Sequence, residues 1–200
     1  MFRKIFRVIC GLQSVSDRTF VSFKPHLKTI CVHFQPKEVL EFGPGNSTAI
    51  ILKYSAAHII SIEESKKWYR KYRSKFSTDR VDVHYKSQGW DLHELSGLGG
   101  PYDLIFVDAG NRPAELKYCV DLLAQDGVVF LHDAHREEYE PGIRAYPQIF
   151  FPERHSCLMC KSSDAMAQLK TIITPDMSCR CRYCNTEKRN RYLAQFTKDT

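Results

Sequence analysis

Between residues 35 and 135 the chain alternates short apolar runs with longer charged stretches whose apolar positions repeat at helical spacing. The apolar runs predict strands at residues 37–42, 58–62, 81–85, 102–107 and 127–131. The intervening stretches predict helices at residues 47–54, 65–75 and 114–123. Strands that alternate with helices in this way predict a parallel sheet with helices packed on both of its faces.

Segments on either side of this region complete the predicted domain. Residues 20–34 fit a helix that covers the sheet, and residues 163–173 fit a last helix. Residues 148–151 and 155–161 are short strand-like runs, which we interpret as an antiparallel hairpin that closes the sheet. The expected fold class is α/β: a doubly wound, mostly parallel, seven-stranded sheet with a closing antiparallel hairpin and a short cysteine-rich C-terminal tail.

The length of 200 residues and the apolar content of 43% suffice for one hydrophobic core. We therefore expect one domain at residues 1–174, with an N-terminal segment at 1–19, and a basic, cysteine-rich tail at 175–200. No run of 18 or more apolar residues occurs, so we expect no membrane partner. The basic and apolar start lacks a clear cleavage site, which favours a cytoplasmic protein with reduced cysteines. The sequence indicates no oligomeric state.

A glycine-containing stretch, LEFGPGNST at residues 40–48, follows the first predicted strand and opens the next helix. Such a turn lets a ligand approach bare backbone at a helix N-terminus. A phosphate-binding loop would need a lysine after its last glycine, and a dinucleotide fold prefers glycine where Ala49 stands. Glu41 can face an ammonium group, and Glu63 can accept hydrogen bonds from ribose hydroxyls. S-adenosylmethionine carries both groups, although the dinucleotide alternative stays open.

Four segments in the same order resemble the class I S-adenosylmethionine-dependent methyltransferases: VLEFGPGNST (39–48), ISIEESKKWY (60–69), YDLIFVDAG (102–110) and LLAQDGVVFLHDAHR (122–136). With the closing hairpin, the resemblance extends over about residues 20–161. It implies that the methionine part of the cofactor is lined by Glu41, Gly43, Gly45, Asn46 and Ser47. It also implies that Glu63 binds the ribose, that the segment with Ser87, Gln88 and Trp90 binds the adenine, and that Asp108 faces both cofactor and reaction site.

Polar side chains gather after the fourth and fifth predicted strands, where ligands of open α/β sheets bind. The candidate catalytic residues are Asp108, His132, Asp133 and His135. Either histidine could act as a general base, and Asp108 with Asp133 could hold Mg²⁺ or another divalent cation.

The pattern is similar to that of metal-dependent O-methyltransferases of small molecules and sugars, which implies a small-molecule or saccharide acceptor. Two departures from that pattern are Ala134, where an asparagine often follows the second acid, and Asn111, where some members have a lysine.

Cys157-x-x-Cys160 and Cys181-x-x-Cys184 have the spacing of a four-thiolate zinc site. Against this, positions three apart in a strand point to opposite faces of a sheet. Reduced thiols without a metal, or a set of thiols with His155, are alternatives. The basic tail would also suit a nucleic-acid partner, so a nucleic-acid methyltransferase and a non-catalytic binding module remain alternative functions.

Overall fold

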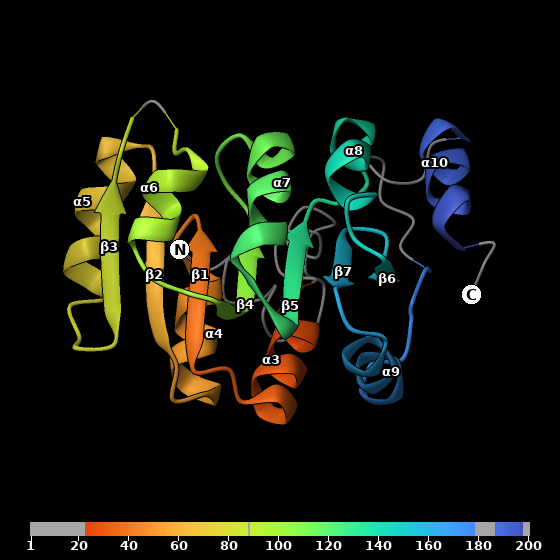
Figure 1. Ribbon diagram of the computed structural model, residues 1–200, viewed down its shortest axis with the longest axis horizontal. Coiled ribbons are helices and arrows are strands. Elements are labelled where there is room, and N and C mark those ends of the chain that lie inside the picture. The colour runs from red at the N-terminus through yellow and green to blue at the C-terminus, as the bar shows by residue number, and fades with distance from the viewer. Residues whose placement is uncertain (1–22, 88, 179–186, 198–200) are drawn as a thin grey trace, which may run out of the picture.

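The computed structural model describes residues 23–87, 89–178 and 187–197. The helices and strands follow one another as the sequence patterns predict, with additional short helices (Figure 1). Their bounds in chain order are α3 (Phe23–Phe34), β1 (Glu38–Phe42), α4 (Asn46–Tyr54), β2 (His58–Glu63), α5 (Lys66–Lys75), β3 (Val81–Tyr85), α6 (Leu92–Gly97), β4 (Tyr102–Val107), α7 (Arg112–Leu122), β5 (Leu123–His132), η1 (Glu137–Tyr139), α8 (Glu140–Ile143), β6 (Gln148–Glu153), β7 (Ser156–Cys160), α9 (Ser163–Ile172) and α10 (Glu187–Thr197).

The seven strands form one sheet in the order β3-β2-β1-β4-β5-β7-β6. Strands β1 to β5 pair in parallel, and β7 pairs antiparallel with both β5 and β6. The predicted fold class is therefore confirmed. Because β1 pairs with β2 on one side and β4 on the other, the chain reverses its winding direction at β1. Ligands of open α/β sheets bind at such a switch point, beyond the carboxyl ends of the strands.

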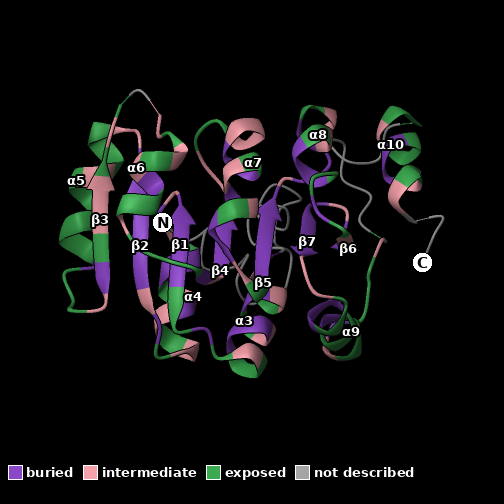
Figure 2. Ribbon diagram, in the orientation of Figure 1, coloured by how far each residue is buried: buried purple, intermediate pink, exposed green. Residues whose placement is uncertain are grey.

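The sheet separates two apolar clusters. Helices α6, α7, α8 and α10 pack on one face, and α3, α4 and α9 pack on the other (Figure 1). Within β4, Leu104 and Phe106 face one cluster while Ile105 and Val107 face the other, as the alternation of a strand requires. Figure 2 accordingly shows the central strands buried along most of their length. Each such side chain contributes about 1.5–3 kcal/mol through burial.

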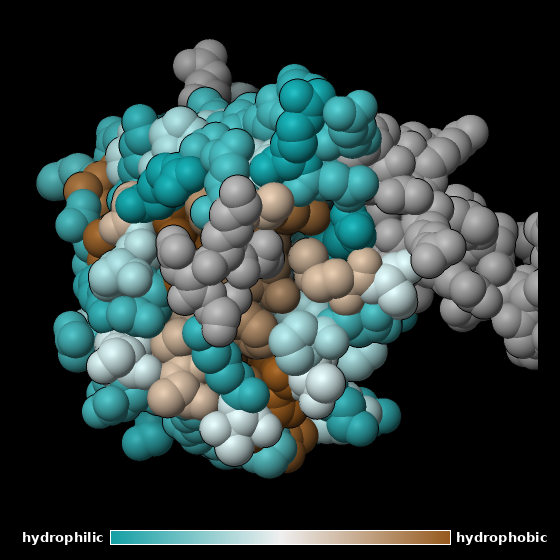
Figure 3. All heavy atoms as spheres, turned by 90° about the vertical axis from the view of Figure 1, so that its right-hand side faces the viewer, coloured by the Kyte–Doolittle hydropathy of each residue, from teal (hydrophilic) through white to brown (hydrophobic). Residues whose placement is uncertain are grey.

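The helix α10 is a finding that the sequence did not predict. Tyr192 and Leu193 are buried in the same cluster as α7 and α8, and the ring of Phe196 contacts that of Phe151 in β6 at 5.3 Å between centroids, with the ring planes tilted by 40°. Residues 187–197 thus pack against the same apolar cluster as α7 and α8. Figure 3 shows apolar residues on this face of the molecule, where a pocket of about 320 Å³ is lined by β6, α10 and residues between them.

Cys157 and Cys160, expected as half of a zinc site, lie in β7 on opposite faces of the sheet. Each is fully buried, and they belong to different apolar clusters. Burial raises the pKa of Cys160 to about 12 and that of Cys157 above its usual value. The structure therefore does not bring these two thiols to one ion, because a strand turns alternate side chains away from each other. Cys181 and Cys184 lie outside the described residues.

None of the described helices is both long and apolar enough to cross a bilayer.

Candidate active site

The glycine loop lies where the tips of β1 and β4 meet. Gly43 has φ +93°, and a Cβ there would stand 2.6 Å from Cβ of Ala109 in the loop after β4. Its amide donates to the carbonyl oxygen of Ile62 in β2 at 2.9 Å. Only glycine combines this left-handed backbone with so close an approach. The loop therefore offers backbone atoms, and no side chain, between the two strand tips.

Glu41 is fully buried directly beneath this loop. Its Oε2 accepts hydrogen bonds from Thr48 Oγ1 at 2.7 Å and from Ser61 Oγ at 2.5 Å, the latter because β1 and β2 pair these two residues. Its Oε1 has no partner with hydrogen-bond geometry among the described residues. Burial raises the pKa of Glu41, and nearby hydroxyl groups only partly offset this. A buried carboxyl group with one unused oxygen suits a cationic ligand group.

The start of α4 completes this part of the site. Gly45 caps the helix, and its amide donates to Thr48 Oγ1 at 2.8 Å. Asn46 and Ser47 are the first two helical residues, and Ser47 is buried. Free amides and the positive end of the helix dipole therefore point toward the ligand side of the loop.

The predicted ribose and adenine residues lie farther along the same sheet edge. Glu63 ends β2, is mostly buried, and accepts from the amide of Ser65 through Oε1 at 2.7 Å. Beside it, a pocket of about 280 Å³ opens between the loops after β3 and β4. Trp90, Gly89 and Glu64 line this pocket. Ser87 is exposed in the turn after β3, and Gln88 lies outside the described residues.

Glu115 is a site residue that the sequence analysis missed. It lines the same pocket from the first turn of α7, and its Oε1 would lie only 1.9 Å from a Cβ at Gly110, whose φ is +74°. Burial, with the charge of Glu64, raises the pKa of Glu115 to about 8. A neutral carboxyl group can both donate and accept a hydrogen bond. The glycine after Asp108 and Ala109 was the one local signal for this close approach.

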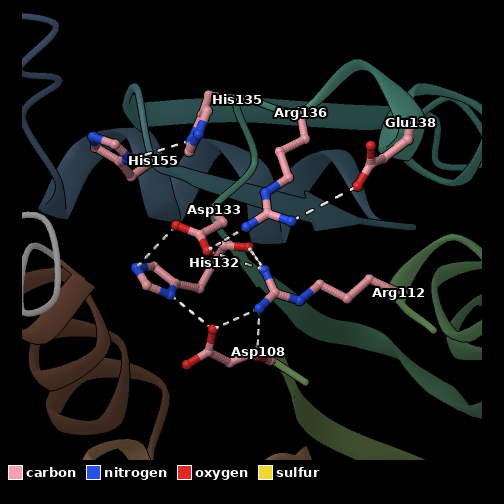
Figure 4. A network of polar contacts seen from close by, with 8 residues as sticks. All are labelled: Asp108, Arg112, His132, Asp133, His135, Arg136, Glu138 and His155. Atoms are coloured by element: carbon pink, nitrogen blue, oxygen red, sulfur yellow. Dashed lines mark hydrogen bonds and ion pairs between the residues drawn. The ribbon is translucent and has the colours of Figure 1, made fainter. Parts of the chain in front are cut away.

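A polar network joins the tips of β4 and β5 (Figure 4). His132 Nδ1 lies 2.8 Å from Asp108 Oδ1. The guanidinium group of Arg112 donates to Asp108 Oδ1 at 3.0 Å, to the Asp108 carbonyl and to the His132 carbonyl. The same group lies 3.6 Å from Asp133 Oδ2. The structure thus brings together three of the predicted catalytic residues, with Arg112 between the two acids.

Exposure and charge separate the roles of these groups. The side chain of Asp108 is 32% exposed, whereas that of His132 is 7% exposed. Burial alone would lower the pKa of His132, but the hydrogen bond and charge of Asp108 outweigh it and raise that pKa. Burial would raise the pKa of Asp133, but the neighbouring His132 and Arg112 lower it overall. Asp133 adopts φ 59°, a left-handed conformation that Asp tolerates better than most residues.

His135, the fourth predicted catalytic residue, turns away from this network toward His155 (Figure 4). The two Nδ1 atoms are 3.1 Å apart, and both rings are buried. Burial, the charge of His155 and that of Arg189 lower the pKa of His135 to about 4. Of the two candidate bases, His132 is therefore the one that can carry a proton near neutral pH.

The sequence predicted a divalent cation between Asp108 and Asp133, where the structure places the side chain of Arg112. Ligand-type atoms of Asp108, His132 and Asp133 lie within 4.8 Å of one another, so distance alone would allow an ion. The guanidinium of Arg112, only 12% exposed, already neutralises both carboxylates from the position between them. A divalent ion bound between the two acids would have to displace this buried cation, so the acid pair does not fit the metal.

Known proteins that resemble this chain are methyltransferases or share their fold. Residues 40–134 match a family described as a methyltransferase domain, and no curated protein sequence matches the chain. Cofactor-bound Rv0187 from MTB has a similar structure, with a TM-score of 0.57 and 19% identity over 71% of this chain and 81% of that one. SAH-bound PaMTH1, a methyltransferase from Podospora anserina, gives a TM-score of 0.52 and 21% identity over 70% and 78% of the two chains.

Spermidine synthase from Thermotoga maritima shares the fold as well, with a TM-score of 0.53 and 18% identity over 74% and 62%. At these identities the structural likenesses show the fold, and the matched domain adds the family. Together with the strand order and the motif at β1, they lead to one conclusion. Residues 40–134 are a methyltransferase domain, and the chain has the fold of the class I S-adenosylmethionine-dependent methyltransferases.

Proposed function

We propose that this methyltransferase transfers the methyl group to an oxygen atom of a small molecule or saccharide, and that Asp108, positioned by His132, accepts the proton. The observation that carries the proposal is the 2.8 Å contact between Asp108 Oδ1 and His132 Nδ1 at the tips of β4 and β5. A hydroxyl acceptor must lose a proton during transfer, and a positioned acid–base pair can take it.

The cofactor residues are assigned by the groups left unused in the structure. Glu41 Oε1 would hold the ammonium group, because it is the buried acceptor without a partner in the described part of the chain. Gly43 and Gly45 would keep side chains out of the way, and the amides of Asn46 and Ser47 would face the carboxylate. Glu63 would bind the ribose, and the pocket with Trp90 and Glu115 would hold the adenine. When bound, S-adenosylmethionine supplies a methyl group on a sulfonium.

The remaining groups orient the acceptor and handle its proton. Asp108 is the better-exposed member of the pair, so its carboxylate would meet the hydroxyl, while His132 stabilises the negative charge from behind. Arg112 donates to the carbonyl oxygen and to Oδ1 of Asp108, and these two hydrogen bonds fix the orientation of the carboxylate. His132 is thus a positioning residue that raises the probability of proton transfer without touching the acceptor.

The test uses labelled S-adenosylmethionine with fractions of hydroxylated small molecules and oligosaccharides. We expect a labelled methyl ether with the native protein. Asp108→Asn and His132→Gln should each lower kcat by about 10²- to 10⁴-fold while the dissociation constant of the cofactor stays unchanged. The activity of the native protein should also fall at low pH, and His132→Gln should shift the pH at which it falls. A product methylated on nitrogen, or full activity in Asp108→Asn, would refute the proposal.

A second acceptor class, nucleic acid, is favoured by one surface. Helix α5 buries none of its ten residues and carries six cations, Lys66, Lys67, Arg70, Lys71, Arg73 and Lys75. Trp68 and Tyr72 stack at 5.6 Å on the same helix. Within the described part of the chain none of the six cations forms an ion pair, whereas Lys188 and Arg191 of α10 contact Glu137 and Glu187.

Aromatic faces among cations without ion pairs suit single-stranded nucleic acid, which supports α5 as a candidate surface for it in addition to the predicted tail. Binding of a labelled oligonucleotide that weakens steeply with salt, and that is lost in Lys71→Glu, would support it. Labelled methyl groups in RNA or DNA would then make it the better assignment.

A further inference from the structure

His135 and His155 come from loops that the fold holds next to each other. His135 lies three residues beyond β5, and His155 lies in the turn between β6 and β7. The amide of Ala134 donates to the carbonyl oxygen of His155 at 3.0 Å, and His132 pairs with Ser156 in the sheet. Two backbone contacts therefore fix the relative position of the two imidazoles, independently of what the rings themselves bind.

The two rings point their Nδ1 atoms at each other. These atoms are 3.1 Å apart, and the ring planes cross at 82° (Figure 4). Both rings are buried. Two nitrogen ligands on a tetrahedral ion with bonds of about 2.0–2.1 Å stand roughly 3.3 Å apart. The observed separation between the two Nδ1 atoms is close to that value.

Asp133 supplies a third ligand atom on the same side. One ligand atom from each of Asp133, His135 and His155 lies within 4.8 Å of the others. Arg136 and Arg112 both contact Oδ2 of this carboxylate, at 3.4 Å and 3.6 Å, whereas Oδ1 lies 4.0 Å from His132 Nε2, so Oδ1 is the oxygen that can turn to an ion. The charge of Glu153 also acts on His155 and partly offsets the cations around the site.

We propose that Asp133, His135 and His155 form a binding site for a first-row transition metal dication, with Zn²⁺ as its preferred occupant. Two imidazoles and one carboxylate select Zn²⁺, Co²⁺ or Fe²⁺ over Mg²⁺ and Ca²⁺, which prefer oxygen ligands. Such an ion ties the loop after β5 to the β6–β7 hairpin and leaves a coordination position for water. The site differs from the acid pair Asp108 and Asp133, and from the cysteine set suggested by spacing.

The experiment measures metal binding rather than methyl transfer. The full chain is stripped with a chelator, and Zn²⁺ and Mg²⁺ are titrated separately by calorimetry. We expect one Zn²⁺ site and no comparable Mg²⁺ binding. Replacing a residue that only supports a metal ligand typically weakens metal binding ~10- to 100-fold. His135→Gln and His155→Gln remove proposed ligands, so each should weaken Zn²⁺ binding by at least that much. His93→Gln, an exposed imidazole on α6, is the matched control and should bind Zn²⁺ normally.

X-ray absorption spectroscopy on the Zn²⁺-loaded native protein keeps the proposal testable if a histidine variant does not fold. The expected first shell contains two imidazole nitrogens and oxygen. A shell containing sulfur, or undiminished Zn²⁺ binding in both histidine variants, would overturn the proposal, as would loss of Zn²⁺ in His93→Gln to the same extent.

Discussion

Replacing the carboxyl group of Glu115 by an amide should make the protein more stable at alkaline pH. Glu115 is 5% exposed, and burial, helped by the charge of Glu64, raises its pKa to about 8 from the usual value of 4.5 for a free glutamate. Folding therefore takes up a proton at any pH between these two values. Because the folded state binds the extra proton, its free energy of unfolding falls as the pH rises through this window.

The size of the effect follows from the two pKa values. Each unit of difference is worth about 1.4 kcal/mol, so the loss in the native protein reaches about 3 kcal/mol at pH 7 and at most about 5 kcal/mol above pH 8. Glu115→Gln carries no ionisable group and loses none of this. The amide can also change stability by an amount that does not depend on pH. The test is therefore whether the difference in free energy of unfolding between Glu115→Gln and the native protein grows as the pH rises.

Urea unfolding at about pH 5, 7 and 9, without cofactor, measures that gap by linear extrapolation. Glu138→Gln is the matched control, because the side chain of Glu138 is 62% exposed and its replacement should leave the gap flat. If the stability curves of Glu115→Gln and the native protein run parallel across this range, the carboxyl group of Glu115 ionises in the folded state as in the unfolded one, and the reasoning fails.

Three further changes test single contacts. Gly43→Ala should cost about 2 kcal/mol or more and weaken cofactor binding, because its Cβ would meet that of Ala109 at 2.6 Å on a left-handed backbone; thermal unfolding and calorimetry measure both. Tyr146→Phe should cost about 1 kcal/mol in urea, since it removes the donor to the buried carbonyl of Leu116 at 2.9 Å. Asp91→Ala should cost about 1 kcal/mol by removing the N-cap of α6, and Asp91→Asn should restore most of it. An unchanged unfolding midpoint would contradict the contact concerned.

The sheet could be predicted from the sequence because β1, β2, β4 and β5 are mostly buried and so appear as short apolar runs, while the edge strand β3 alternates apolar and polar residues. Of the helices that were missed, α6 and α10 show two different reasons. α6 is only six residues long, although Asp91 and Glu94 form a capping box that marks its start. α10 is polar over most of its surface, and its apolar side is carried by Tyr192, Leu193 and Phe196, whose spacing fits one face of a helix.

Some site residues could likewise be assigned from the sequence, and others could not. Glu41, Gly43 and Glu63 could be assigned because strand ends and a glycine loop are local features. The partners of His135 and Glu115 could not, because they depend on which distant segments the fold brings together. Gly110 is the one local signal for the packing of the Glu115 carboxyl group, and nothing near His135 signals His155 twenty residues later. Likewise, the place of Arg112 between two carboxylates is visible only in three dimensions.

Asp108 and Asp133 were predicted as equivalent ligands of one ion, yet their surroundings assign them opposite tasks. Arg112 lies 3.0 Å from Asp108 Oδ1 and 3.6 Å from Asp133 Oδ2, and the hydrogen bond from His132 goes to Asp108. Asp108 is therefore held by two partners, while Asp133 is the carboxylate that can turn to a metal. We expect Asp108→Asn to reduce turnover without changing Zn²⁺ affinity, and Asp133→Asn to weaken Zn²⁺ binding while cofactor affinity stays the same. Calorimetry with Zn²⁺ and with cofactor separates the two, and equal Zn²⁺ losses in both variants would mean that the acids share one ion after all.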